Sequence, residues 1–467
     1  MQTVKQPGSF RDPSGHVYTR KGEIFRTINQ SYKQNYEHLL KSGLYRYLVE
    51  SSLLIPHTQV GAELREDLPD AGQVFEVIKP RPIVFISYPY EWSFSQLKDA
   101  ALATLKIQKA AIEYNMILKD SSVYNIQFDK GKPVLIDTLS FEKYEEGVPW
   151  VAYRQFCQHF LAPLALMAHK DLRLGKLFRL FLDGIPLDLA SSLLPWHTFL
   201  TLSCGVHIHG HAKFQRCFLN SRLNQNHAQK RINRLSLLGL VDSLEAGVNS
   251  IKLSPKNKTT WVQYYKDGQS YTAEASAHKK QIVTSLIDGL QPKNVWDIGS
   301  NTGLFSRIIG KTGIPVISFD LDPMSVEHNY LEMKKNNESN LLPLVMDINN
   351  PSPAMGWNLG ERMSLWERGP ADTIVALALI HHLVIGNNLS FEQLAVFFHQ
   401  HCHSAIIEFV PKDDPQAKRL LAARKDIFDK YSQLNFEKEF EMFFFIEGRE
   451  TVRESKRIIY LLRNKTC

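Results

Sequence analysis

Short apolar runs alternate with amphipathic stretches through the C-terminal half of the chain, from about residue 260 to the end. That alternation is typical of a parallel α/β sheet, in which each strand is followed by a helix. The sequence therefore predicts an α/β domain over residues 256–467. The runs that we predict as its strands are 294–298, 315–319, 342–346, 372–378 and 405–410.

The N-terminal half follows a less regular pattern. A long helical stretch at 93–114 lies among short strand-like runs, which are 74–78, 83–87, 123–128 and 133–137. From about residue 150 the chain is mostly helical, until a lysine-rich link at 254–260. We therefore expect an α+β accessory domain over 1–150 and a mostly helical region over 151–255.

Composition indicates the class of protein and its cellular location. The chain has 467 residues, and 44% of them are hydrophobic, which is typical of a globular protein. No apolar run approaches the roughly 18 residues of a membrane span, and the N-terminus does not resemble a secretory signal. Cysteines are few and scattered, at positions 157, 204, 217, 402 and 467. We therefore expect a cytoplasmic protein without a membrane span.

The net charge of +7 is local. Residues 165–235 hold ten Lys or Arg against three Asp, so this window alone accounts for the whole surplus. Within it, residues 172–181 alternate leucines and phenylalanines with Arg173, Lys176 and Arg179, which predicts an amphipathic helix with a basic face. Two interpretations stay open: a solvated helix face, or a surface that binds RNA, a nucleotide or a phosphorylated substrate.

Polar groups recur where the predicted C-terminal strands end. Gly299 and Gly303 follow the first strand, and glycines there let backbone amides and a helix N-terminus approach a ligand. Asp320 ends the second strand and suits the hydroxyls of a ribose. Asp347 ends the third, and the pair His381 and His382 follows the fourth. Open α/β sheets bind ligands at this edge, so the sequence predicts one site there.

This arrangement, with Asp297-x-Gly299-x-Asn-Thr-Gly303 followed by Asp320 and Asp347, resembles motifs I to III of class I S-adenosylmethionine-dependent methyltransferases. The resemblance covers about residues 260–465 and implies a Rossmann-like sheet of order 3-2-1-4-5-7-6 with strand 7 antiparallel. The closing strands would be 441–446 and 457–462. A dinucleotide-binding sheet is the alternative, and it is weakened because the G-x-G-x-x-G spacing is absent.

The resemblance also implies roles for single residues. Asp297 and the loop at 299–303 would surround the methionine end of S-adenosylmethionine, although Asn301 stands where the usual loop has glycine. Asp320 would hold the ribose and Asp347 would face the adenine amine. The remaining candidates for cofactor binding are Ser300, Leu321, Ile348 and Tyr271.

At finer grain the chain resembles the NoeA-like nodulation-protein methyltransferases, through 261–265, 350–353, 376–383, 407–411 and, in the N-terminal half, 87–93. Methyl transfer needs in-line positioning and, for oxygen or nitrogen acceptors, a group that takes a proton. His382 and His381 are the candidate catalytic residues, with packing as the alternative for each. Glu408, inside the fifth strand, is either an acceptor ligand or a buried, paired carboxylate.

Residues 80–140 carry a weaker resemblance to kinase-like phosphotransferases. Asp120, Asn125 and Asp137 follow their D-x4-N…D order, in which the first Asp positions the nucleophile and the other two hold magnesium. Leu118 replaces the usual histidine, and no glycine-rich phosphate loop is evident upstream. A degenerate kinase-like domain for binding or scaffolding, an active phosphotransferase and an unrelated hairpin all stay open.

A third candidate feature is a cluster of histidines beside two cysteines. His207, His209 and His211 alternate between Cys204 and Cys217, so on a strand they would share one face. Zinc sites usually space their ligands differently, and we predict no metal. The histidines would then lie at the mouth of an acceptor site.

The sequence thus predicts a methyltransferase that uses S-adenosylmethionine, with a small-molecule, glycan or lipid-type acceptor. An RNA methyltransferase that uses the basic window 165–235 is one alternative, and a scaffold with a vestigial cofactor site is another. The oligomeric state stays open.

Overall fold

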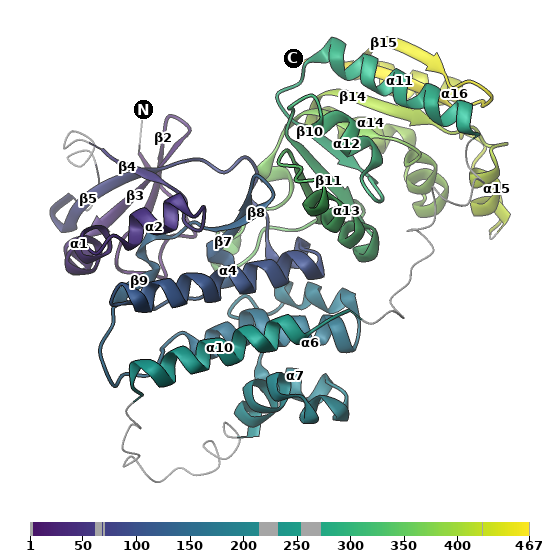
Figure 1. Ribbon diagram of the computed structural model, residues 1–467. Helices are drawn as coiled ribbons and strands as arrows, with labels where there is room; N and C mark the ends of the chain where they lie inside the picture. Colours follow the sequence, from purple (N-terminus) through teal and green to yellow (C-terminus); the bar gives the residue numbers. More distant parts are fainter. Residues whose placement is uncertain are drawn as a thin grey trace. The chain divides into compact units, whose positions relative to one another are not determined.

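The computed structural model describes residues 3–60, 68, 71–213, 232–253, 272–422 and 424–466 (Figure 1). The chain divides into two compact units. Unit 1 comprises Met1–Asn257 and Ala354–Arg362, and unit 2 comprises Lys258–Pro353 and Met363–Cys467. The predicted regions 1–150 and 151–255 therefore form one unit together.

Unit 2 is built on a seven-stranded sheet of order β12-β11-β10-β13-β14-β16-β15. Numbered along the unit this is 3-2-1-4-5-7-6, the order predicted above. Strand β16, the seventh along the unit, runs antiparallel to both of its neighbours, β14 and β15. The strands are β10 (Val295–Ile298), β11 (Val316–Asp320), β12 (Leu341–Val345), β13 (Ala371–Ala376), β14 (Cys402–Phe409), β15 (Phe444–Thr451) and β16 (Ile458–Asn464).

The core of unit 2 explains why its strands read as apolar runs. All four residues of β10 are buried because the strand has parallel neighbours on both sides. The prediction of a strand at 441–446 is wrong at its start, since α16 continues to Glu441 and β15 begins at Phe444. The helices are α11 (Ala273–Leu290), α12 (Leu304–Gly310), α13 (Pro323–Lys335), η13 (His382–Gly386), α14 (Phe391–His401), α15 (Pro415–Ala422) and α16 (Gln433–Glu441).

Unit 1 opens with a five-stranded antiparallel sheet of order β1-β2-β3-β5-β4, and two strand pairs follow, β6 with β9 and β7 with β8. The prediction of a strand at 83–87 is wrong, because the backbone there is irregular. The backbone N–H of Ser87 donates to the side-chain oxygen of Gln127 instead of to a neighbouring strand. The strands are β1 (Val4–Lys5), β2 (Val17–Arg20), β3 (Glu23–Asn29), β4 (His57–Gln59), β5 (Val74–Pro80), β6 (Met116–Leu118), β7 (Ile126–Asp129), β8 (Lys132–Leu135) and β9 (Phe141–Lys143).

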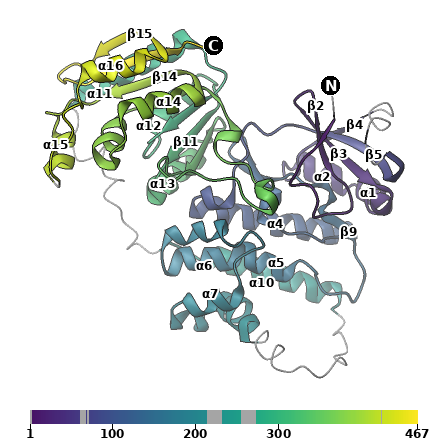
Figure 2. The ribbon, with the colours of Figure 1, turned by 180° about the vertical axis from the view of Figure 1, so that it is seen from behind.

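The long helix predicted at 93–114 is confirmed as α4 (Phe94–Glu113), which begins at a capping box formed by Ser93 and Gln96. It packs along α10 (Arg234–Ser250), as both views show (Figures 1 and 2). Further helices include α1 (Lys33–Lys41), α2 (Leu44–Glu50), α5 (Tyr153–Phe156), η6 (Cys157–Leu161), α6 (Ala162–His169), η7 (Leu172–Arg179), α7 (Leu187–Leu193), η8 (Trp196–Leu200), α8 (Leu202–Cys204) and η9 (Gly205–Gly210).

The basic stretch at 172–181 differs from its prediction. It folds as the 3₁₀ helix η7 rather than as an α-helix, with Gly175 buried against the side chain of Met167. Of its charged residues, Arg173 is exposed and pairs with Asp171 at 2.6 Å, whereas Lys176 and Arg179 are half-buried. The tighter winding changes which side chains share a face, so the helical pattern of the sequence is only partly realised.

Candidate functional site

A cavity of about 390 Å³ lies at the carboxyl ends of the parallel strands in unit 2. Four successive strands contribute to it, through residues that directly follow β10, β11, β12 and β13. The predicted candidates that line it are Gly299, Asn301, Asp320, Leu321, Asp347, Ile348 and His382. Strand-end chemistry was therefore a sound guide to the location of this site.

The loop after β10 owes its shape to left-handed backbone conformations. Gly299, Asn301 and Gly303 have φ values of +76°, +51° and +80°. Asparagine tolerates this region better than other residues with a side chain, so Asn301 can replace glycine there. Its backbone N–H donates to Asp320 at 2.7 Å, which ties the loop to the end of β11.

Gly303 lies where a side chain has no room. A Cβ there would lie 2.2 Å from Oδ1 of Asn329, and that oxygen is held by Arg307 at 2.9 Å. We expect Gly303→Ala to lower the free energy of unfolding by about 2–4 kcal/mol, since strain and overpacking combine. Urea unfolding of the variant measures this loss.

Gly313→Ala is the matched control, because Gly313 also has a left-handed φ of +92° but nothing within 4 Å of its missing Cβ. It should cost only the backbone strain, about 1–2 kcal/mol. Equal losses in the two variants would show that contact with Asn329 contributes nothing.

Three predicted cofactor residues support the loop without lining the cavity. Asp297 is buried within β10 and accepts a hydrogen bond from Ser306 at 2.5 Å. Burial raises the pKa of Asp297 to about 6, against the lowering effect of that bond. Ser300 donates to the carbonyl of Phe319, and Gly303 is the N-cap residue of α12. Direct contact with a ligand is thus not supported for these three, and Tyr271 lies outside the described residues.

Asp320, unlike Asp297, does face the cavity. Its two oxygens accept from the backbone N–H groups of Asn301 at 2.7 Å and Asp322 at 2.8 Å. Burial raises the pKa of Asp320 to about 6, and the two backbone bonds oppose that rise. Asp347, at the end of the next strand, accepts from the N–H of Asn349 at 3.0 Å. Two fixed carboxylates therefore face one cavity from neighbouring strands.

The two histidines after β13 have different environments. His382 lines the cavity, and burial lowers its pKa, so its ring is neutral near pH 7. His381 is fully buried behind it, with the ring centroids 4.2 Å apart. Neither ring nitrogen of His381 has a hydrogen-bond partner among the described residues. Because His381 does not reach the cavity lining, the prediction that it is catalytic is not supported.

Of the two interpretations of Glu408, the structure supports a buried, paired carboxylate. It is fully buried in β14 and pairs with Lys279 of α11 at 2.6 Å and with Arg457 at 3.8 Å. Arg457 in turn makes a bidentate contact with Asp414, at 2.8 and 3.0 Å. Since Glu408 is absent from the cavity lining and is surrounded by cations, it is a paired structural carboxylate rather than an acceptor ligand.

Sequence reasoning missed most of the apolar lining of the cavity. Leu377, Leu379 and Leu383 contribute to it, as does Leu420 from α15. Asp322 also lines it, two residues after Asp320, and its side chain caps α13 through Met324 and Ser325. The sequence did indicate Asp322, because an aspartate directly before a proline is typical of a helix start. A leucine has no comparable sequence signal for a binding site.

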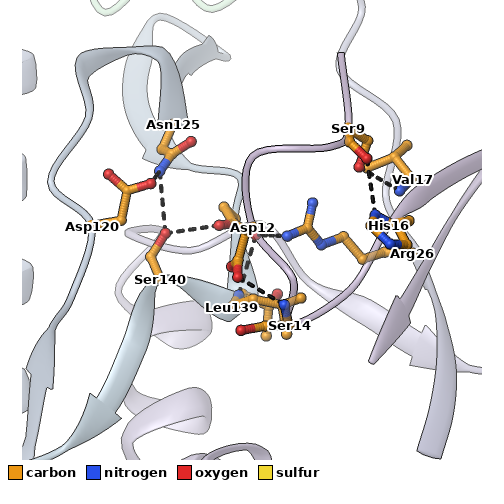
Figure 3. A network of polar contacts seen from close by, with 12 residues as sticks. Ser9, Asp12, Ser14, His16, Val17, Arg26, Asp120, Asn125, Leu139 and Ser140 are labelled. Carbon is orange, nitrogen blue, oxygen red and sulfur yellow. Dashed lines mark hydrogen bonds and ion pairs between the residues drawn. The ribbon is translucent and has the colours of Figure 1, made fainter. Parts of the chain in front are cut away.

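In unit 1 the residues of the kinase-like pattern do come together (Figure 3). Asn125 donates to Asp120 at 3.0 Å and to Ser140 at 3.2 Å, and Ser140 donates to Asp137 at 2.9 Å. Arg26, which sequence reasoning missed, pairs with Asp137 at 2.9 Å. The predicted grouping of Asp120, Asn125 and Asp137 is thus present as a network of internal contacts.

The acidic groups of this network already have partners. Gln155 donates to Asp120 at 2.7 Å, and Lys119 contacts Asp12 at 3.3 Å from the loop between β1 and β2. No group of three or more His, Cys, Asp or Glu that suits a metal ion occurs in the part of the chain that is described. The described geometry therefore gives no support to a magnesium site here.

The histidine cluster does not lie on a strand. Residues 202–210 are helical, with His207 and His209 buried. His207 contacts Tyr153 and Ser243, and His209 contacts Ser191 and Thr198, all between 2.7 and 3.0 Å. His207 and His209 thus use both of their ring nitrogens inside unit 1, which gives no support to their placement at the mouth of an acceptor site. Cys217 lies outside the described residues.

Comparison with known proteins places the whole chain. The chain is 31% identical over 460 residues to nodulation protein NoeA of Rhizobium meliloti strain 1021. The aligned region covers 97% of this chain and 94% of that protein. The chain belongs to the NoeA family. No family model matches this NoeA-family chain.

Two solved structures give weaker similarities. One is magnesium protoporphyrin IX methyltransferase of Synechocystis PCC 6803 with bound SAH, which is 18% identical with a TM-score of 0.31. The matched region covers 44% of the NoeA-family chain and 92% of that methyltransferase chain. The bifunctional kinase-methyltransferase WbdD is 17% identical, covering 43% and 42%, with a TM-score of 0.30. At these TM-scores neither similarity carries an argument, so the fold description rests on the strand order itself.

None of the described helices combines the length and the apolar character that crossing a membrane requires.

Proposed function

We propose that this NoeA-family protein is a methyltransferase that uses S-adenosylmethionine. The observation that supports it most is the cavity at the strand ends of unit 2, where Asp320 faces inward beside a left-handed glycine loop. Gly299 leaves room there, since its missing Cβ would lie 3.1 Å from Leu379. A carboxylate beside such a loop suits a ribose, and the leucine lining suits an adenine ring.

The residues of the cavity divide the work of holding this cofactor. Asp320 would accept hydrogen bonds from the ribose hydroxyls and Asp347 from the adenine amine. Gly299 and Asn301 would border the methionine end. When bound, the cofactor supplies an electrophilic methyl group. His382, whose neutral ring borders the same cavity, would take the proton of an oxygen or nitrogen acceptor. The acceptor that we propose is a small molecule, a glycan or a lipid.

Binding of tritiated S-adenosylmethionine in equilibrium dialysis tests the cofactor and the role of His382. The full chain should retain one molecule per chain, and His382→Ala should retain it equally because the ring is assigned to the acceptor. Failure of the folded wild-type chain to retain label would overturn the proposal. Loss of binding in His382→Ala would move that histidine into the cofactor site.

Cofactor affinity should also depend on pH through Asp320. Its raised pKa, about 6, means that it is protonated in the free protein below that pH. A neutral acid accepts hydrogen bonds less well, so ribose binding favours the ionised form. We expect the Kd for S-adenosylmethionine to be flat above pH 7 and to rise up to about tenfold per unit below pH 6. Calorimetric titrations between pH 5 and 8 measure this profile, and Asp320→Asn should flatten it.

Two alternatives make different use of the chain. An RNA methyltransferase would use the basic window 165–235, and its RNA affinity would fall steeply with salt. A scaffold with a vestigial site would bind no cofactor at all. The proposed enzyme ranks first because its cavity retains the inward carboxylate that a vestigial site has no reason to keep.

For unit 1 we propose a degenerate kinase-like domain that serves binding or scaffolding rather than phosphotransfer. The argument is that Asp120, Asn125 and Asp137 are already occupied by Gln155, Ser140 and Arg26. Magnesium would have to displace these contacts. We also propose a cytoplasmic location, which suits the buried thiols of Cys157 and Cys204 that form no disulfide.

A further inference from the structure

A patch of exposed apolar side chains lies in unit 1, far in sequence from the cavity of unit 2. Six large apolar residues between positions 193 and 206 are exposed, with exposed fractions from 37% to 79%. Isolated exposed leucines are ordinary, but a dense run of this kind usually marks an interaction site. We define the apolar patch as Leu193, Trp196, Phe199, Leu200, Leu202 and Val206.

The helices that carry the patch are held together by hydrogen bonds and ring contacts. Elements α7, η8, α8 and η9, which carry its residues, contact one another. His209 joins them through Ser191 at 2.7 Å and Thr198 at 2.8 Å, and the ring of Phe199 stacks on it at 3.6 Å. These buried contacts satisfy the polar groups beneath the patch. Its side chains are therefore presented outward by the fold rather than left over from a poorly packed core.

Spacing places two residues of the patch on one face of a helix. Leu202 and Val206 are four residues apart on a continuous helical run, so they lie on the same side. Residues between and after them, Cys204 and Ile208, are fully buried on the opposite side. The run therefore carries apolar side chains on its outer face as well as on its inner one.

Exposed lysines flank the patch in the described part of the chain. One is Lys213, three residues after the end of η9. Lys170 is exposed at the end of α6, and the rings of His169 and His197 lie 5.7 Å apart, which brings that end beside η8. The acids of the basic window 165–235 are offset in part, since Asp183 pairs with Arg11 from outside it at 2.7 Å.

We propose that the apolar patch inserts into the headgroup region of an anionic lipid bilayer, with the neighbouring cations contacting lipid phosphates. Lys and Arg beside exposed Trp, Phe and Leu are the combination that holds a protein on such a surface. Nucleic acid shares the attraction to cations, but it offers no use for the aliphatic Leu193, Leu200, Leu202 and Val206. Because the patch lies wholly in unit 1, this inference stands independently of methyl transfer.

Vesicle flotation of the full chain tests the proposal. The protein should float with vesicles of phosphatidylcholine and phosphatidylglycerol at low salt and remain behind with phosphatidylcholine alone. The triple variant Trp196→Ser, Leu200→Ser, Leu202→Ser should bind at least about tenfold more weakly, because it removes most of the inserted apolar area. The matched control is Ile427→Ser, Leu434→Ser, Met442→Ser, which changes three exposed apolar residues of unit 2 and should float like the wild type.

Other outcomes would overturn the proposal. One is a folded wild-type protein that stays unbound to anionic vesicles, and another is equal binding by the patch variant. A third is single-stranded RNA binding that the patch variant loses while vesicle binding is absent, which would assign the surface to RNA. A fourth is a concentration-dependent dimer in light scattering that only the patch variant abolishes, which would assign it to a second copy of the chain.

Discussion

Asp320→Asn is expected to weaken binding of S-adenosylmethionine by about 100-fold or more. The substitution keeps the size of the side chain but replaces a charged acceptor with a neutral amide. Each hydrogen bond to a charged group contributes roughly 1.5–3 kcal/mol, and two ribose hydroxyls would lose theirs. Isothermal titration calorimetry at pH 7.5 measures the loss, well above the pKa of about 6 at which Asp320 itself titrates.

The matched control for this variant is Asp413→Asn. Asp413 is an exposed carboxylate of the same unit, paired with Lys456 and absent from the cavity lining. Its replacement should leave cofactor affinity unchanged. Circular dichroism and urea unfolding of Asp320→Asn check that the loop still folds, because Asp320 also accepts from the N–H of Asn301. Wild-type affinity in a folded Asp320→Asn protein would remove Asp320 from the binding site.

Glu408→Gln should lower the free energy of unfolding by about 3–5 kcal/mol. Glu408 neutralises Lys279 at 2.6 Å and lies 3.8 Å from Arg457, and all three side chains are almost wholly buried. Removing one partner of a buried ion pair leaves an uncompensated charge, which is far more costly than losing an exposed pair. Urea unfolding measures the loss.

A double-mutant cycle separates charge from packing in this cluster. Lys279→Met combined with Glu408→Gln should cost less than the sum of the single changes, because it removes the cation that Glu408 balances. Arg457 keeps its bidentate contact with Asp414 in the double variant. If Glu408→Gln unfolds like the wild type, the structural assignment is wrong and an acceptor role for Glu408 becomes the better explanation.

The location of the site was predictable because strand-end chemistry depends on local sequence. Asp320 ends the parallel strand β11 and Asp347 lies two residues after β12, and such strand ends meet at one edge of the sheet. The side to which a residue within a strand points was not predictable. Ile298 lines the cavity, so its neighbour Asp297 faces the other side, where Ser306 donates to it. Successive side chains of a strand alternate between the two faces of the sheet, but the sequence does not show which face borders the ligand.

Long-range contacts account for the remaining differences. Glu408 and Lys279 are 129 residues apart in sequence, so no local pattern reveals that they pair. His207 and His209 alternate as on a strand, yet the run from Leu202 is helical and directs both rings into unit 1. In unit 1, the three residues of the D-x4-N…D order, Asp120, Asn125 and Asp137, do lie in one network of contacts. That order could not show that Arg26 of β3 would pair with Asp137.

The most direct test of the methyltransferase proposal is calorimetric titration of the full chain with S-adenosylhomocysteine and, in parallel, with NAD⁺. Both are adenosine-containing ligands that sheets of this class can bind, so each controls for the other. We expect saturable binding of S-adenosylhomocysteine at one molecule per chain and no heat of binding with NAD⁺. A folded protein that binds NAD⁺, or that leaves S-adenosylhomocysteine unbound at high micromolar concentration, would contradict the proposal.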